Sequence, residues 1–184
     1  MSAVRRLLVV VAAVALAVGA IACGAGDPDG EGAGRDGLAA AQGLPEGLAG
    51  KPAPRIALTD ARTGARFDSA SLAGRPYVVT FLYTNCPDVC PLIGQEIREA
   101  LAQLGPDARR VAALAVSVDP RHDDAAAVRA WLRRQRQPAN FHYLIGTEAE
   151  LAPVWKAFYA APQTPGDPES AHPAIVWLVD RDGR

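Results

Sequence analysis

Two cysteines separate a buried strand from an amphipathic helix, and this unit restricts the chain to folds built on a strand–loop–helix step. Residues 76–83 are almost all apolar and rich in β-branched and aromatic side chains, which is typical of a strand buried on both faces. Cys86 and Cys90 follow, and Pro91 suits the first turn of a helix. The helical spacing appears in Ile93, Ile97, Leu101 and Leu104. The pattern places both thiols at the carboxyl edge of a sheet, where open α/β sheets bind ligands.

Further strands and helices alternate along the chain. Strands are predicted at residues 55–59, 65–67, 111–118, 141–145 and 174–179, and helices at 123–136 and from a capping box at Thr147–Glu150. Such alternation predicts an α/β fold with a central mixed sheet and helices on both faces. Because the chain stops at Arg184, just after the last strand, we expect a truncated C-terminal end and an unprotected edge strand.

The N-terminal segment has the layout of a secretory signal. Arg5 and Arg6 precede an apolar run that ends at Ala22, and small residues lead directly into Cys23. This run is shorter than the ~20 residues that a membrane-spanning helix needs, although an uncleaved anchor stays an alternative. The small residues before Cys23 resemble a lipobox. We therefore predict a signal peptide (1–22) and, on the extracytoplasmic face of the cell membrane, a lipidated Cys23.

The next stretch differs in composition from the folded part. Residues 23–50 are rich in glycine and poor in large apolar side chains, so they cannot bury enough surface to order themselves. They are predicted to be a flexible tether, and residues 51–184 to be the folded domain. With a net charge of −1 and 6% aromatic residues, the chain lacks the basic and stacking surfaces of a nucleic-acid-binding protein.

The spacing of the cysteines favours chemistry over a structural role. A helix N-terminus lowers the pKa of a thiol, and three intervening residues let both sulfurs face one point. The pair can then form a disulfide or chelate one soft metal ion. A static disulfide is the alternative, but so short a loop removes little entropy from the unfolded chain.

Three segments resemble the Sco/SenC family: residues 80–91 around the cysteines, 117–120 and 171–174. The resemblance implies a thioredoxin-like fold and a copper site made of Cys86, Cys90 and His172. It also implies delivery of copper to the binuclear centre of cytochrome c oxidase subunit II, with the membrane and other copper carriers or thiol reductants as further partners. The alternative function within this family is thiol–disulfide exchange by Cys86 and Cys90, which would keep the cysteines of that centre reduced.

The ligand types agree with copper. Two thiolates and an imidazole suit Cu(I) and are acceptable to Cu(II), whereas a thioether site is excluded because the only methionine is Met1. Among the histidines, His122 is interpreted as a solvated residue at a helix start and His142 as structural. His172, in the loop before the last strand, stands in the family's third segment, so the resemblance implies that it is the third ligand.

Other residues near the motif have weaker interpretations. Asp88 and Asp119 could attract a cation or support a ligand, or they could be ordinary loop residues. Pro173 could approximate the cis-proline that faces the cysteines of thioredoxins, which would favour thiol exchange. A peroxidase of the peroxiredoxin type is discounted, because Tyr83 and Val79 stand where that family has threonine and proline.

Overall fold

The computed structural model describes residues 48–164 and 174–184. Cys23, His172 and Pro173 lie outside these ranges, together with the predicted signal peptide and nearly all of the predicted tether. What the structure describes is therefore the predicted folded domain without residues 165–173, preceded by residues 48–50.

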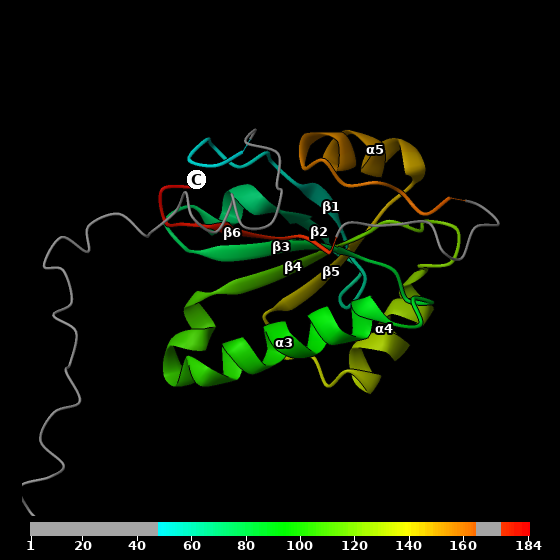
Figure 1. The fold of residues 1–184 in the computed structure, drawn as a ribbon, viewed down its shortest axis with the longest axis horizontal. Coiled ribbons are helices and arrows are strands. Elements are labelled where there is room, and N and C mark those ends of the chain that lie inside the picture. Colours follow the sequence, from blue (N-terminus) through cyan, green and yellow to red (C-terminus); the bar gives the residue numbers. More distant parts are fainter. Residues whose placement is uncertain (1–47, 165–173) are drawn as a thin grey trace, which may run out of the picture. The chain divides into compact units, whose positions relative to one another are not determined.

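A six-stranded sheet forms the centre of this domain, with the strand order β2–β1–β5–β4–β3–β6 (Figure 1). The strands are β1 (Ala57–Asp60), β2 (Arg66–Asp68), β3 (Tyr77–Leu82), β4 (Ala112–Ser117), β5 (Phe141–Ile145) and β6 (Val176–Val179). The neighbours β3, β4 and β5 are parallel, whereas β1, β2 and β6 pair antiparallel. Each strand lies within two residues of its predicted range, so the prediction of a mixed sheet is confirmed.

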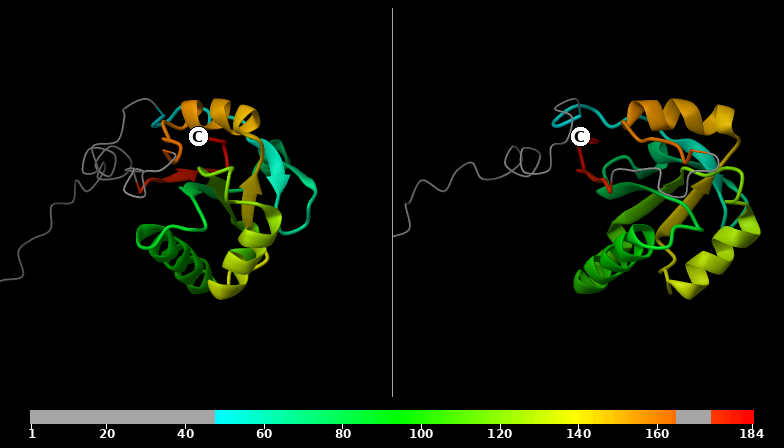
Figure 2. Two further views of the ribbon diagram at one scale, coloured as in Figure 1. Left: turned by 90° about the vertical axis from the view of Figure 1, so that its right-hand side faces the viewer. Right: turned by 45° about the vertical axis from the view of Figure 1, so that its right-hand side comes forward.

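Helices cover both faces of the sheet. Helices α3 (Val89–Gln103) and α4 (Ala125–Arg134) lie on one face and α5 (Glu148–Ala157) on the other (Figures 1 and 2). Two short 3-10 helices, η1 (Ser69–Leu72) and η2 (Gly105–Arg110), connect elements at the surface. None of the helices in the described ranges is long and apolar enough to cross a membrane.

The central strands are buried as their composition predicts. All six residues of β4 and five of the six in β3 are buried. Phe81 of β3 contacts Phe158 after α5, with 5.7 Å between ring centroids. On the opposite face, Trp131 of α4 packs against Phe141 and Tyr143 of β5. These aromatic contacts attach one helix to each face of the sheet.

The helix ends show how local sequence sets the boundaries. At the start of α5, Thr147 and Glu150 form the predicted capping box. Helix α4 was predicted to begin at Asp123, but its N-cap is Asp124, whose carboxylate accepts the N–H groups of Ala126 and Ala127. The prediction was wrong at this end because Asp123 points into the interior, where it accepts other hydrogen bonds.

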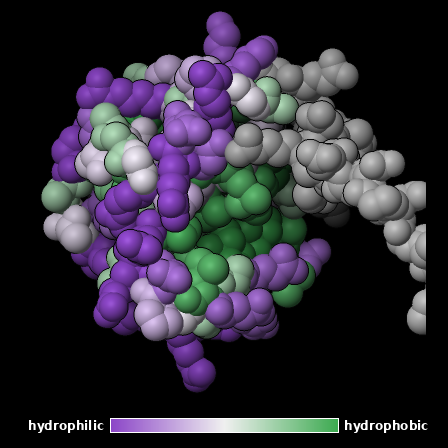
Figure 3. Space-filling model, turned by 90° about the vertical axis from the view of Figure 1, so that its left-hand side faces the viewer, coloured by the Kyte–Doolittle hydropathy of each residue, from purple (hydrophilic) through white to green (hydrophobic). Residues whose placement is uncertain are grey.

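Strand β6 is an outer strand of the sheet, as predicted. Its residues Val176 and Leu178 are 38% and 76% exposed. Leu178 pairs with Val78 of β3, so both side chains lie on the same face. Figure 3 shows apolar side chains gathered in a hollow on one side of the molecule.

Candidate metal centre

The two cysteines lie at the carboxyl edge of the sheet. Cys86 is in the loop after β3, and Cys90 is in the first turn of α3. Both are free thiols, and their residues are only 8% and 2% exposed. The predicted strand–loop–helix arrangement therefore places the two buried sulfurs within hydrogen-bond reach of each other.

The sulfur of Cys86 occupies the N-terminal end of α3. The N–H of Cys90 donates to Cys86 Sγ at 3.3 Å, and the N–H of Asp88 also donates to this sulfur. The side chain of Asp88, the N-cap residue, makes no capping hydrogen bond. The sulfur thus accepts N–H groups that a helix leaves unsatisfied at its first turn.

These contacts give the two thiols different acidities. Burial by itself raises the pKa of Cys86, but hydrogen bonds from the Cys90 side chain and from nearby N–H groups outweigh it, so the pKa is lowered. Burial raises the pKa of Cys90 far above its ordinary value, and the hydrogen bond to Cys86 raises it further. Cys86 is therefore the more acidic thiol of the pair, and the Cys90 thiol donates a hydrogen bond to its sulfur.

Tyr83 adds another donor to the same sulfur. Burial and the hydrogen bond to Cys86 raise the pKa of the Tyr83 phenol to about 12. The phenol is therefore protonated at neutral pH and donates a hydrogen bond to the Cys86 sulfur. A phenol in this position stabilises the Cys86 thiolate relative to the thiol.

The histidines and acids of the described ranges lie as follows. His142 pairs through Nδ1 with Asp60 Oδ2 at 2.8 Å and packs against the ring of Phe67, which agrees with its structural interpretation. The side chain of His122 is 61% exposed, and its Nδ1 lies 2.7 Å from Oδ2 of the buried Asp119. Asp119 thus holds His122, and Asp88 is exposed to solvent.

A third ligand next to the cysteines is not found within residues 48–164 and 174–184, where no group of three Cys, His, Asp or Glu side chains could hold a metal ion. The predicted third ligand, His172, lies outside the described residues, as does Pro173. Ile175 is described, and its carbonyl accepts the hydroxyl of Thr80 at 3.0 Å. The segment that enters β6 therefore runs beside the end of β3.

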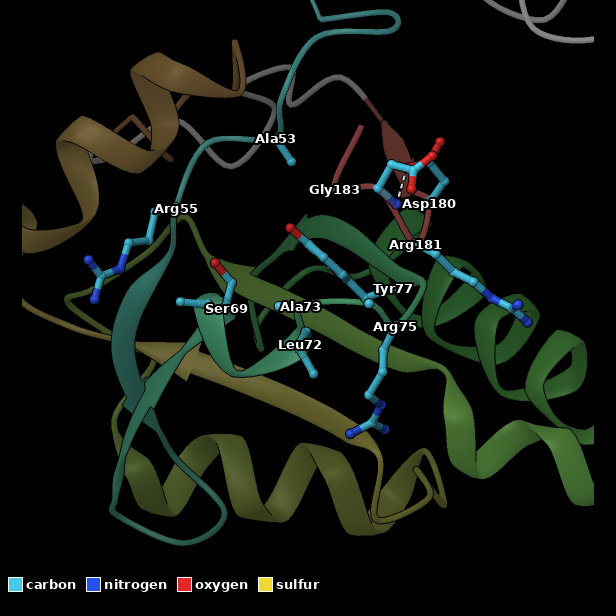
Figure 4. A pocket seen from close by; sticks show the side chains of 13 residues that line it. Ala53, Arg55, Ser69, Leu72, Ala73, Arg75, Tyr77, Asp180, Arg181 and Gly183 are labelled. Carbon is cyan, nitrogen blue, oxygen red and sulfur yellow. Dashed lines mark hydrogen bonds between the residues drawn. The ribbon is translucent and has the colours of Figure 1, made fainter.

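A separate cavity of about 360 Å³ lies at the opposite edge of the sheet, and neither cysteine lines it (Figure 4). Its wall includes Tyr77, at the start of β3, and residues 180–183, after β6. Two of its cations already have partners, since Arg55 is bonded to Asp68 and Arg75 donates to backbone carbonyls. This cavity is distinct from the cysteine edge.

A family model, SCO1/SenC, matches residues 54–184, which include the strand, the cysteine loop and all the elements after them. The chain belongs to the SCO1/SenC family. Among solved structures, it is similar to copper-bound ScoI of Bradyrhizobium japonicum, with 36% sequence identity and a TM-score of 0.63 over 72% of this chain and 85% of that one. This likeness identifies the fold as thioredoxin-like, which confirms the prediction.

Two further SCO1/SenC relatives are more distant. A protein of Stutzerimonas stutzeri, described as a candidate copper-binding protein, is 31% identical over 135 residues, or 71% of this chain. The chain spans 65% of the length of that relative. The structure of a SCO1/SenC lipoprotein from Bacillus anthracis has a TM-score of 0.62 at 22% identity, over 72% of this chain and 80% of that one, and shares the fold.

The structure also adds residues to the SCO1/SenC site that the sequence analysis missed. Asp123 is 3% exposed and accepts hydrogen bonds from Thr84, in the cysteine loop, and from Ser117, at the end of β4. The sequence signal for a buried carboxylate here was the pair Asp123-Asp124, because only one of the two side chains is needed to cap α4. Position alone does not reveal which of the two turns inward.

Proposed function

We propose that this chain is a membrane-tethered, extracytoplasmic copper metallochaperone that binds one copper ion through Cys86, Cys90 and His172. The observation that carries the proposal is the pair of free, buried thiols at the carboxyl edge, hydrogen-bonded to each other, in a member of the SCO1/SenC family. A copper ion needs soft donors that can be deprotonated together, and two thiols at one point supply them. Similar proteins are described as copper-bound or as candidate copper-binding proteins, which supports the choice of metal.

The third ligand is proposed from the path of the chain. Strand β6 runs antiparallel to β3, with Val176 opposite Thr80, so β6 begins at the edge of the sheet where β3 ends and the cysteine loop starts. His172 precedes Ile175 by three residues, and Ile175 is bonded to Thr80. An imidazole near this edge would complete a three-coordinate site of two sulfurs and one nitrogen, a donor set that suits Cu(I) and accepts Cu(II).

The cellular setting is proposed from the N-terminal sequence and the family. Export through residues 1–22 and lipidation of Cys23 would hold the domain at the extracytoplasmic face, with residues 23–50 as its tether. A similar Bacillus anthracis protein is described as a lipoprotein. The proposed recipient is subunit II of cytochrome c oxidase, at its binuclear copper site, with other copper carriers or thiol reductants acting before it.

Thiol–disulfide exchange is the second candidate, and one observation favours it. The lowered pKa of Cys86 and the raised pKa of Cys90 give the pair one nucleophile and one buried partner thiol. This division is the one that a dithiol reductant uses: the thiolate attacks a disulfide, and the second thiol then releases the mixed disulfide. Such a reductant needs the two cysteines and does not need His172.

A copper titration of the reduced full chain tests the proposal, with His172→Ala as the key variant and His122→Ala as the matched control. We expect one tight equivalent of copper in the wild type and in His122→Ala, because the exposed His122 is held by Asp119. His172→Ala should bind at least ~10-fold more weakly and change the thiolate-to-Cu(II) absorption band, since a ligand is lost. Unchanged affinity in His172→Ala would refute the three-ligand site. Absence of tight binding, combined with fast exchange against a test disulfide, would favour the reductant.

A further inference from the structure

Asp123 is a buried carboxylate that receives hydrogen bonds from three different parts of the fold. Its Oδ1 accepts the backbone N–H of Thr84 at 2.8 Å and the Thr84 hydroxyl at 2.7 Å. Its Oδ2 accepts the hydroxyls of Ser117 at 2.7 Å and of Tyr143 at 3.0 Å. A carboxylate with all of these donors is satisfied although it is withdrawn from water, which is the condition for burying such a group.

The partners show what this carboxylate holds together. Thr84 lies in the loop after β3, Ser117 ends β4, Tyr143 belongs to β5, and Asp123 itself precedes α4. The hydroxyl of Ser117 also accepts the N–H of Asp119 at 3.1 Å. The turn after β4 is therefore part of the hydrogen-bond network around Asp123. Asp123 therefore joins the carboxyl ends of β3 and β4 to the middle of β5.

The loop that carries Cys86 depends on this junction. The backbone N–H of Thr84, two residues before Cys86, is bonded to Asp123. The nearest other backbone bonds are from Val118 N–H to the Leu82 carbonyl at 3.0 Å and from Cys86 N–H to the Tyr83 carbonyl at 3.3 Å. Burial raises the pKa of Asp123, but its hydrogen bonds favour the charged form, and bonds to an ionised carboxylate are about twice as strong as neutral ones. In its ionised form Asp123 is thus a strong attachment of the loop to β4 and β5.

We propose that Asp123 is a positioning residue for the dithiol: by holding Thr84 through both its backbone N–H and its hydroxyl, the carboxylate keeps the Cys86 sulfur next to Cys90, so that both sulfurs meet one ion or one disulfide partner. This inference rests on the proposed function for its copper readout, but the closeness of the two sulfurs can be measured without copper. Holding two ligands in place before binding removes the ordering cost that a mobile loop would carry.

The charge of Asp123 has two further effects, which oppose each other. It lies near enough to Cys90 to disfavour a second thiolate there. It also attracts a cation at the same place. Removing the charge therefore changes copper affinity in two opposite directions, whereas releasing Thr84 weakens copper binding.

The test compares Asp123→Asn with Asp124→Asn in the full chain. Both remove one carboxylate charge at neighbouring positions, but Asp124 is the exposed N-cap of α4, and its carboxylate accepts the N–H groups of Ala126 and Ala127. We expect copper affinity to fall ~10-fold in Asp123→Asn, the size typical of removing a group that orients a ligand, and to stay within about twofold of wild type in Asp124→Asn.

The second readout is the equilibrium of the reduced pair with oxidised glutathione. Cys86 and Cys90 give up two electrons and two protons and form one disulfide, while one oxidised glutathione becomes two reduced molecules. The equilibrium constant reports how closely the two sulfurs are held, and we expect it to fall ~10-fold in Asp123→Asn at pH 7 and not in Asp124→Asn. If the wild type fails to bind copper, the copper proposal is refuted. If the glutathione equilibrium constant still falls in Asp123→Asn and not in Asp124→Asn, the role of Asp123 is upheld.

A pair of loop variants covers the case in which Asp123→Asn fails to fold. Thr84→Val removes the hydroxyl that donates to Asp123 and keeps the backbone bond, whereas Thr84→Ser keeps both. We expect Thr84→Val to lower the glutathione equilibrium constant and Thr84→Ser to restore it. Equal values for these two variants, or a folded Asp123→Asn with wild-type values in both readouts, would overturn the proposal.

Discussion

Gly94→Ala should destabilise the domain, although alanine is the better helix former. Gly94 lies in α3, the helix that carries Cys90, and a Cβ at this position would be 2.7 Å from Cη2 of Trp131 and 3.0 Å from Nε2 of Gln137. Trp131 is 1% exposed and packs against Phe141 and Tyr143, so its ring has no free space to enter. The close approach of α3 to α4 therefore depends on glycine at this position.

The net magnitude follows from three contributions. Alanine gains about 1 kcal/mol over glycine inside a helix. Overpacking a buried site costs about 1–3 kcal/mol. The buried bond from Gln137 Nε2 to the Gly94 carbonyl, 2.7 Å long, is displaced as well, at about 1 kcal/mol. The two losses exceed the gain, so we expect a net loss of about 1–3 kcal/mol in the free energy of unfolding.

Urea unfolding followed by circular dichroism measures this loss. The urea midpoint should fall by roughly 1 M at an ordinary dependence on denaturant of about 1–3 kcal/mol/M. Glu96→Ala, at an exposed position of the same helix, is the control and should stay within about 0.5 kcal/mol of wild type. A Gly94→Ala variant as stable as wild type, or more stable, would refute the close packing of α3 against Trp131.

Two further predictions concern protonation. At pH 7, iodoacetamide should alkylate Cys86 well before Cys90, because hydrogen bonds lower the pKa of Cys86 while burial raises that of Cys90; mass spectrometry of the modified peptides gives the order, and equal rates would contradict it. The second prediction concerns Asp60, whose burial alone would raise its pKa, but whose bonds to His142 and the Arg62 N–H lower it overall. A lowered carboxyl pKa gives stability that is present above the unfolded-state value of about 3.9 and is lost as the pH falls through the folded value, so Asp60→Asn should flatten the loss of stability below about pH 4 in acid titrations of the unfolding midpoint. Equal acid sensitivity in Asp60→Asn and wild type would argue against a stabilising interaction between Asp60 and His142.

Much of the fold could be predicted because its signals are local. Apolar runs at β3 and β4, the helical spacing from Ile93 and the capping box at Thr147 each act within a few residues, and each element formed near its predicted position. The boundary error at α4 has the same origin, since two adjacent aspartates are equally good caps by local criteria. Hydrogen bonds from Thr84, Ser117 and Tyr143, which are 39, 6 and 20 residues away, select Asp123 for the interior.

At the candidate metal centre, some features follow from one contiguous segment and others depend on residues that are distant in the sequence. The motif around Cys86 and Cys90 is contiguous, so this one segment contains the strand, the two thiols and the helix end whose N–H groups donate to the Cys86 sulfur. The acidity of each thiol depends on burial and on donors such as Tyr83, and the support of the loop depends on Asp123, Ser117 and Tyr143. Asp123, Ser117 and Tyr143 come from separate segments of the chain, and no local pattern relates them to the cysteines. They meet because parallel strands bring their carboxyl ends to one edge of the sheet, which happens only once the chain has folded.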